Sequence, residues 1–160
     1  MSALATLATD ILTALVAELT ADGITVPDRR YVHAGEVAWD CEQFVVSLKA
    51  MRPTMTGGAD VLPTGPGGCV VLRSAVFELS LIHCAPEPFQ DGSRPTSVAL
   101  NTWGIGRCDD ALSLMRGVVR AHNAGSFGEV CSQVRIEEVN SLGPDGGYGG
   151  VAVTIAVQLT

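Results

Sequence analysis

Any fold for this chain must accommodate two stretches near the C-terminus, residues 130–136 and 151–159, in which apolar and polar side chains alternate. A period of two is typical of strands with one buried face. Residues 140–150, which lie between them, contain five glycines and Pro144. We therefore expect an antiparallel hairpin with a long, flexible tip. Its alternating apolar residues are Val130, Val134, Ile136, Val151, Val153, Ile155, Val157 and Leu159.

Three earlier segments also have the properties of strands. Tyr31–His33 is short, and Gln43–Met51 alternates with a period of two. The run Cys69–Cys84 would span about 50 Å as one strand, at ~3.3 Å per residue. That length exceeds the needs of a compact domain, so we expect one end to project. Polar residues fall on both alternating sets, so we also expect either a bulge or a change of covering layer midway. The glycine-rich segment 55–68 before it is expected to be a long loop.

Residues 2–22 have the periodicity of a helix, and Gly23 provides a stop signal. A second helical region is expected in two parts, Ser97–Trp103 and Asp109–Asn123, with an interruption at the glycines between them. Asp109 and Asp110 would then lie near the start of the second part, and Arg116 and Arg120 near its end, in agreement with the helix dipole. The predicted inner face consists of Leu112, Met115, Val119 and His122.

The predicted order is helix, three strands, helix, two strands. Runs of adjacent strands favour a mixed or mostly antiparallel sheet with the two main helices packed on it, which is an α+β fold with a long C-terminal hairpin. The 160 residues are 47% hydrophobic, enough for one domain with its own core, so residues 1–160 are assigned to a single domain.

The net charge of −7 argues against binding of nucleic acid through a basic surface. Nine arginines and one lysine form no polybasic run, which disfavours attachment to a membrane surface. The apolar N-terminus lacks the basic segment of a signal peptide, and no uninterrupted apolar run approaches about 18 residues. We therefore expect no membrane-spanning helix and a protein made in the cytoplasm.

No motif indicates catalysis, a metal site or a cofactor. The five cysteines form no C-x-x-C pair, and the three histidines lack the spacing of metal ligands. His83 and Cys84 are neighbours on a predicted strand and would point to opposite faces, so they do not form a nucleophile and base pair. The expectation is a protein with no catalytic residues, no metal and no cofactor.

The outer face of the first helix is unusual because it carries few charges. Thr9 and Thr13 lie on it among other small residues. A face that contacts only water normally carries more charge. A neighbouring subunit that covers part of this face is one explanation, and an ordinary surface helix is the other.

The order of elements and one local segment resemble a phage family. The segment Val37-Ala38-Trp39-Asp40-Cys41-Glu42-Gln43-Phe44-Val45-Val46, the N-terminal helix, the glycine-rich loop before a long strand, and the closing helix plus hairpin are similar to tail terminator proteins of long-tailed, siphovirus-type actinobacterial phages. The resemblance covers most of the chain in element order.

The resemblance implies a virion protein of the tail or neck that is assembled in the host cytoplasm. Such a subunit forms a homo-oligomeric ring, expected to be a hexamer, on the last ring of the tail tube protein. It ends tube polymerisation and presents a surface to the head-completion, or stopper, protein. Genomic DNA would pass through the lumen without sequence-specific binding, which the negative net charge permits.

A closed ring built from one kind of subunit by head-to-tail contacts needs two different, complementary patches. For the first patch we predict the segment from Trp39 and Asp40 to Glu42 together with the face of Thr9 and Thr13. For the second we predict the projecting part of Cys69–Cys84, which carries Arg73 and Glu78. Another neck protein, such as a head–tail stopper or connector, is the nearest alternative, and a cytosolic thiol-dependent enzyme or small-ligand binder is an alternative of another class.

Overall fold

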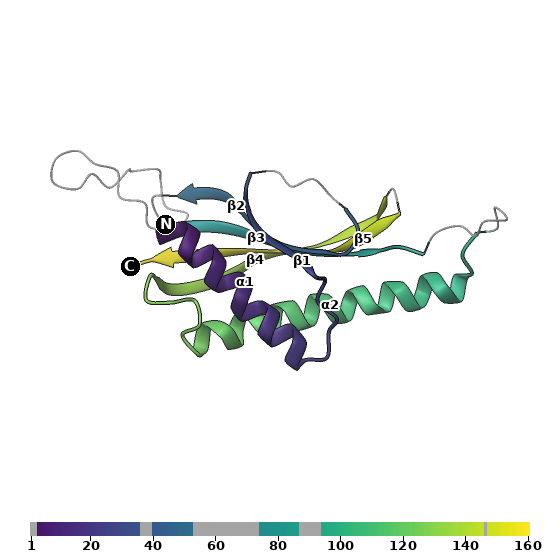
Figure 1. Ribbon diagram of the computed structural model, residues 1–160, viewed down its shortest axis with the longest axis horizontal. Helices are drawn as coiled ribbons and strands as arrows, with labels where there is room; N and C mark the ends of the chain where they lie inside the picture. The colour runs from purple at the N-terminus through teal and green to yellow at the C-terminus, as the bar shows by residue number, and fades with distance from the viewer. Residues whose placement is uncertain (1–2, 36–39, 53–73, 87–93, 146) are drawn as a thin grey trace.

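The computed structural model describes residues 3–35, 40–52, 74–86, 94–145 and 147–160 (Figure 1). Its elements agree in type and order with the sequence-based expectation. They are α1 (Ala3–Ala21), β1 (Arg29–Ala34), β2 (Gln43–Arg52), β3 (Ser74–Cys84), α2 (Ser97–Asn123), β4 (Cys131–Asp145) and β5 (Tyr148–Leu159). The α+β class is confirmed.

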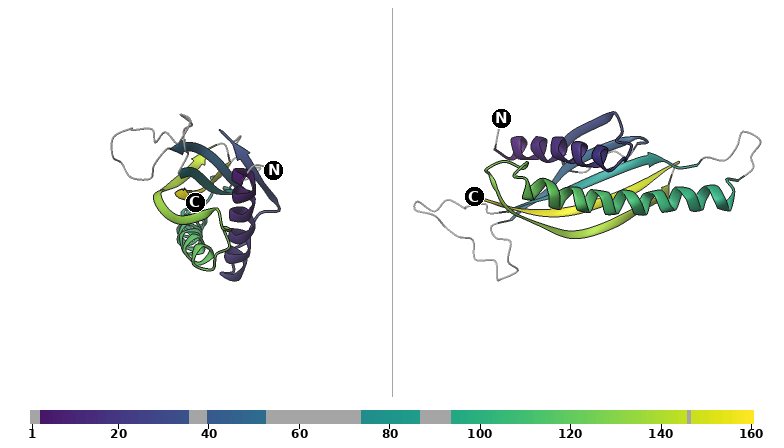
Figure 2. Two further views of the ribbon diagram at one scale, coloured as in Figure 1. Left: turned by 90° about the vertical axis from the view of Figure 1, so that its left-hand side faces the viewer. Right: turned by 90° about the horizontal axis from the view of Figure 1, so that it is seen from below.

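The five strands form one mixed sheet in the order β1-β2-β3-β5-β4. β1 runs parallel to β2, and every other neighbouring pair is antiparallel. Both helices lie on the same face of this sheet (Figures 1 and 2). The molecule is therefore a two-layer sandwich whose outer strands are β1 and β4.

The core lies between the helix layer and the sheet. α1 contributes a stripe of buried residues spaced three or four apart, and the facing strand residues include Phe44, Phe77 and Ile155, which are fully buried. Burying a large apolar side chain stabilises the fold by roughly 1.5–3 kcal/mol, so this stripe holds α1 in place. The helix ends before Gly23, whose φ of 77° favours glycine. The α1 stripe consists of Leu7, Ala8, Ile11, Leu15 and Leu19.

α1 corresponds to the apolar N-terminus, where the sequence predicts no membrane-spanning helix. With 19 residues and a mean hydropathy of 1.5, it is long and apolar enough to cross a membrane. The inner helix of a two-layer sandwich has the same composition, because one side faces the core. We interpret α1 as such a helix, since Ile11, Leu15 and Leu19 are completely buried against the rest of the chain.

α2 is one continuous helix, so the expected interruption at Gly104 and Gly106 is wrong. The helix begins after Thr96, whose side-chain oxygen accepts a hydrogen bond from the backbone N–H of Ala99 at 3.2 Å. Trp103 donates a hydrogen bond from Nε1 to the carbonyl of Cys84 at 3.1 Å, which attaches this part of the helix to the sheet. Tertiary contacts of this kind override the low helix propensity of glycine.

The continuous helix also changes the interpretation of its charges. Asp109 and Asp110 lie in the middle of α2 and not near its start, so the predicted interaction with the N-terminal dipole is wrong. The last turn does carry Arg120 and His122, as a favourable interaction with the C-terminal dipole requires.

The C-terminal hairpin is confirmed, but its expected long tip is wrong. β4 continues to Asp145 and β5 begins at Tyr148. Gly149 and Gly150 belong to β5, where a Cβ atom at Gly150 would lie 2.1 Å from the carbonyl oxygen of Leu81 and one at Gly149 would lie 2.6 Å from Cη2 of Trp103. Glycines in this strand allow close packing.

Of the two alternatives expected midway along β3, the bulge is wrong. β3 pairs with β5 without a register shift from Ser74 to Cys84, and the shift occurs in the neighbouring strand β2, between Leu48 and Ala50. Residues 69–73 and the predicted loop 55–68 lie outside the described residues. The described length of β3 is 11 residues.

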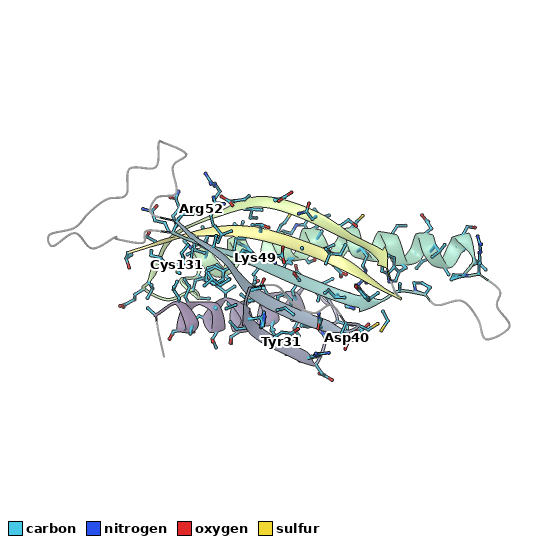
Figure 3. All side chains as sticks on the ribbon, turned by 90° about the horizontal axis from the view of Figure 1, so that it is seen from above. Tyr31, Asp40, Lys49, Arg52 and Cys131 are labelled. Atoms are coloured by element: carbon cyan, nitrogen blue, oxygen red, sulfur yellow. The ribbon has the colours of Figure 1, made fainter. Side chains whose placement is uncertain are left out.

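The sheet face away from the helices carries paired charges (Figure 3). Lys49 lies 2.9 Å from Glu78, and Glu137 lies 2.6 Å from Arg135 and 3.5 Å from Arg52. The charges on this face therefore largely neutralise one another.

Candidate functional site

The outer side of α2 carries an apolar stripe that the rest of the described chain does not cover. Val98, Ile105, Leu112 and Val119 are spaced seven residues apart, and their exposed fractions are 72%, 55%, 49% and 51%. Seven residues make about two helical turns, so the four side chains point to the same side. We call these four residues the α2 stripe.

The position of the stripe corrects the predicted inner face of this helix. Leu112 and Val119 are exposed, and Met115 and His122 are only partly buried. The residues that α2 buries are Asp110, Ser113, Leu114, Gly117, Val118 and Ala121.

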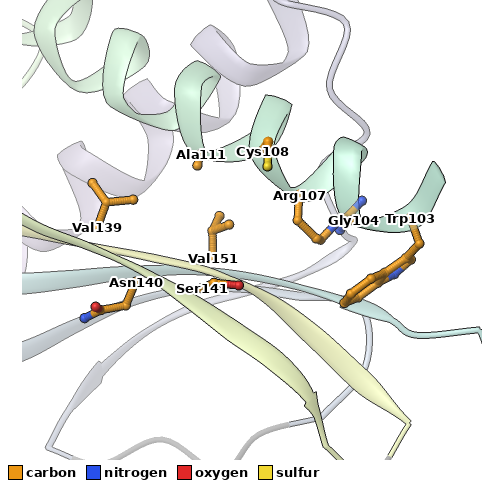
Figure 4. A pocket seen from close by; sticks show the side chains of 9 residues that line it. All are labelled: Trp103, Gly104, Arg107, Cys108, Ala111, Val139, Asn140, Ser141 and Val151. Carbon is orange, nitrogen blue, oxygen red and sulfur yellow. The ribbon is translucent and has the colours of Figure 1, made fainter. Parts of the chain in front are cut away.

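A groove runs between α2 and the outer strand β4. Two adjoining cavities of about 350 and 410 Å³ share Val119 and Ile136 in their linings. The apolar part of the wall also includes Met115, Val118 and Val134. A third cavity of about 280 Å³ lies further along α2, between Cys108, Val139 and neighbouring residues (Figure 4). We call this the α2–β4 groove. Apolar grooves beside an edge strand, which has one side without a strand partner, are typical of interaction surfaces.

The opposite side of the molecule has a second apolar surface. A cavity of about 330 Å³ lies between α1 and β1–β2, and its lining includes Leu4, Val32, Leu48 and Met51. We call this the α1–β1 flank. β1 is the outer strand here, as β4 is at the other edge.

Thr9 and Thr13, which the sequence analysis placed in an interface, lie exposed on α1. Their hydroxyl groups donate to the carbonyls of Ala5 and Thr9, both at 2.9 Å. Each hydroxyl is thus engaged by its own helix, and the residues around them carry little charge. This face is suited to close contact with another surface.

The other predicted interface residues do not form one patch with these threonines. Glu78 is paired with Lys49 on the sheet face away from the helices. Asp40 is exposed and lies 2.6 Å from Arg29, near the start of β1 (Figure 3). Trp39 and Arg73 lie outside the described residues.

Glu42 belongs to a polar cluster that the sequence analysis missed. Its carboxylate accepts a hydrogen bond from the N–H of Cys84 at 3.0 Å and lies 3.2 Å from Nδ1 of His83. Nε2 of His83 is 3.6 Å from Asp110, and Arg107 is 3.0 Å from the same carboxylate oxygen. The spacing of Arg107 and Asp110, three residues apart on a helix, was the only available signal.

This cluster connects the segment before β2, the end of β3 and the middle of α2. Burial raises the pKa of Asp110, while Arg107 opposes that change and the negative charges of Asp109 and Glu42 add to it. Glu42 has a φ of 52°, a left-handed conformation that is uncommon for this residue type. The cluster lies where α2 packs on the end of β3, and the guanidinium of Arg107 lies over the ring of Trp103 at 5.5 Å.

The thiol-enzyme alternative can be compared with one cysteine–histidine pair. Sγ of Cys131 lies 3.8 Å from Nδ1 of His122. Burial raises the pKa of the Cys131 thiol, although a hydrogen bond with the backbone of Gln133 opposes the change. A nucleophilic cysteine needs the opposite shift, toward the thiolate. This pair is therefore poorly suited to nucleophilic chemistry.

Within the described part of the chain, histidine, cysteine, aspartate and glutamate side chains form no group of three that could hold a metal ion. The features that distinguish this molecule are surfaces: the α2 stripe, the α2–β4 groove and the α1–β1 flank. No family model matches the chain, and a search of curated proteins finds no significant match.

Proposed function

We propose that this chain is a structural subunit that assembles into a ring, and that the ring ends the tail tube of a long-tailed phage. The sequence resemblance suggests the phage and the hexamer. The supporting observation is that the sandwich has two different open sides, the α2–β4 groove and the α1–β1 flank, at opposite edges of one sheet.

The directions of the outer strands support a head-to-tail contact. β1 and β2 run in one direction, β3 in the other, β5 with β1, and β4 against it. A second copy placed beside β4 in the same orientation would bring its β1 antiparallel to β4. This contact uses one surface of each kind and leaves the other pair free, which is the requirement for a heterologous interface. A constant rotation between successive copies then closes the chain of contacts into a ring.

The helix layer would continue across the same contact. α1 lies over β1 and β2, and α2 lies over β5 and β4 (Figure 2). The α1 of the added copy would therefore lie beside α2, where its uncharged surface around Thr9 meets Met115 and Val119. Most of this contact is apolar and excludes water. Arg116 lines the same cavity as Met115 and Val119, so the contact requires its guanidinium to stay at the solvent-exposed rim.

Several functional assignments remain part of this proposal. The ring binds the tail tube protein on one side and a head-completion protein on the other, and DNA passes through its lumen. The net charge of −7 is compatible with weak interaction between DNA and the wall. A head–tail stopper or connector would share the ring but would occupy the side of the neck nearer the portal.

Gold-labelled antibody against this chain, applied to phage particles that contain it, tests the assignment. We expect the label at the junction between head and tail. When heads are detached, the label should stay with the tail tube. Label that stays with detached heads would favour a stopper or connector. Particles without label, together with purified protein that forms no rings alone or on tubes, would contradict the proposal.

A further inference from the structure

The α2 stripe is flanked by two charges of opposite sign, Asp109 and Arg116, which are seven residues apart. Both side chains are exposed, and neither takes part in an ion pair among the residues that the structure describes. Leu112 lies between them, three residues after Asp109 and four before Arg116. The stripe thus has an apolar centre with one charge toward each end.

This arrangement is self-complementary. When two α2 helices pack antiparallel with a two-fold axis close to Leu112, the two leucines meet at the axis. Ile105 and Val119 are each seven residues from Leu112, so Ile105 of one copy lies opposite Val119 of the other. The same axis places Asp109 opposite Arg116 in both halves of the pair. Apolar residues at a heptad spacing with flanking opposite charges are the features of a two-helix interface.

We propose that free copies of this chain pair through α2, in an antiparallel two-fold dimer centred on Leu112. The second copy is the occupant favoured by the charges, because the two Asp109–Arg116 contacts form only when the partner presents the same stripe in reverse. α2 lies at a corner of the sandwich, so its outer side is accessible (Figure 2, left). With three apolar residues from each copy, the dissociation constant is expected to be on the order of micromolar.

This pairing is independent of the proposed function. Its consequence for ring formation, however, rests on the proposed function. The stripe borders the α2–β4 groove, and Val119 belongs to both. A chain paired through α2 therefore cannot accept the α1 of another copy beside α2. If the ring joint is as proposed, free subunits are held as dimers and form the ring only where a tube end competes for them.

Charge exchange tests the pairing. Sedimentation equilibrium should detect the dimer in the native chain. The single changes Asp109→Arg and Arg116→Asp each place like charges opposite one another, and we expect each to weaken dimerisation at least about tenfold. The double change Asp109→Arg with Arg116→Asp restores opposite charges and should recover the native constant to within about threefold.

Apolar variants supply a matched comparison. Leu112→Glu places two carboxylates at the axis and should abolish the dimer. Val98→Glu introduces the same charge on the same stripe, but Val98 lies 14 residues from the axis, and its opposite position, residue 126, is beyond the end of α2 at Asn123. This variant should dimerise like the native chain. Circular dichroism checks that each variant is folded.

The pairing would be overturned by a native chain that stays monomeric, by a double charge exchange that fails to recover dimerisation, or by loss of the dimer in Val98→Glu. A hexamer that is insensitive to all charge changes would also overturn it, while leaving the proposed ring intact. The two proposals can also fail separately in the other direction. If the variants change dimerisation as expected but the antibody labels no head–tail junction, the pairing is supported and the proposed function is contradicted.

Discussion

At the scale of single residues, the cost of burying Asp110 is the feature with the clearest consequence. Its side chain is almost completely buried between Arg107 and His83. Burial raises the pKa of this carboxyl group, and Arg107 only partly offsets the effect. A carboxyl group whose pKa is raised by folding binds its proton more tightly in the folded protein, so its contribution to stability is greatest at low pH and is lost as the pH rises through the folded pKa.

We therefore expect Asp110→Asn to change how stability depends on pH. The neutral amide resembles the protonated acid, so the free energy of unfolding of the variant should exceed that of the native chain at pH 7 by on the order of 1 kcal/mol. The advantage should shrink as the pH falls toward 4. Urea unfolding at a series of pH values measures both quantities.

Asp28→Asn is the control for this experiment, because Asp28 is fully exposed beside Arg30. Its removal should leave the pH dependence unchanged. A loss of stability at pH 7 in Asp110→Asn would show instead that the ion pair with Arg107 outweighs the cost of burial.

At the scale of elements, the glycines of α2 differ in what surrounds them. A Cβ atom at Gly104 or Gly106 would have no described neighbour within 4 Å, and both residues are helical. Alanine has a higher helix propensity, so Gly104→Ala and Gly106→Ala should each raise the free energy of unfolding by roughly 0.5–1 kcal/mol. Urea denaturation measures the change.

Gly117 is the matched comparison within the same helix. A Cβ atom there would lie 3.2 Å from Cβ of Glu18 and 3.4 Å from Cδ2 of Leu15, where α2 packs on α1. Gly117→Ala should therefore gain less than the other two, or lose stability. Equal gains at all three positions would contradict the close packing of the two helices.

The same glycines explain which elements could be predicted from the sequence. Periodicity predicted α1, β2 and the C-terminal hairpin, because their apolar stripes face one core. It did not mark β1, which was expected only as the short segment Tyr31–His33, and α2 was expected in two parts. Glycine was interpreted as a break at Gly104 and as a loop signal at Gly149 and Gly150. In the structure it is tolerated in a helix that Trp103 holds to the sheet, and it is required where β5 passes close to Leu81. Those reasons are tertiary, and local sequence does not contain them.

The candidate site was only partly predictable for a related reason. Periodicity selected Leu112 and Val119 as an apolar face but could not show whether the core or another molecule covers it. The cluster of Glu42, His83 and Asp110 joins residues far apart in the sequence, so the spacing of Arg107 and Asp110 was its only local signal.

At the scale of the whole molecule, net charge would oppose the proposed assembly and apolar surface would favour it. Each copy has a net charge of −7, so copies repel one another at low ionic strength. The proposed ring contact is largely apolar, and salt therefore screens the repulsion without weakening the contact itself.

We accordingly expect the fraction of ring-sized particles to increase severalfold between about 0.02 and 0.5 M sodium chloride, where the screening length falls to a few ångströms. Analytical ultracentrifugation with Leu112→Glu, which cannot form the α2 dimer, isolates this effect. The fraction of native chain in the proposed α2 dimer should change less with salt. Salt screens the repulsion between copies but also weakens the two Asp109–Arg116 pairs of the dimer. Rings of Leu112→Glu that dissociate as salt is added would place ion pairs, and not apolar surfaces, at the joint between subunits.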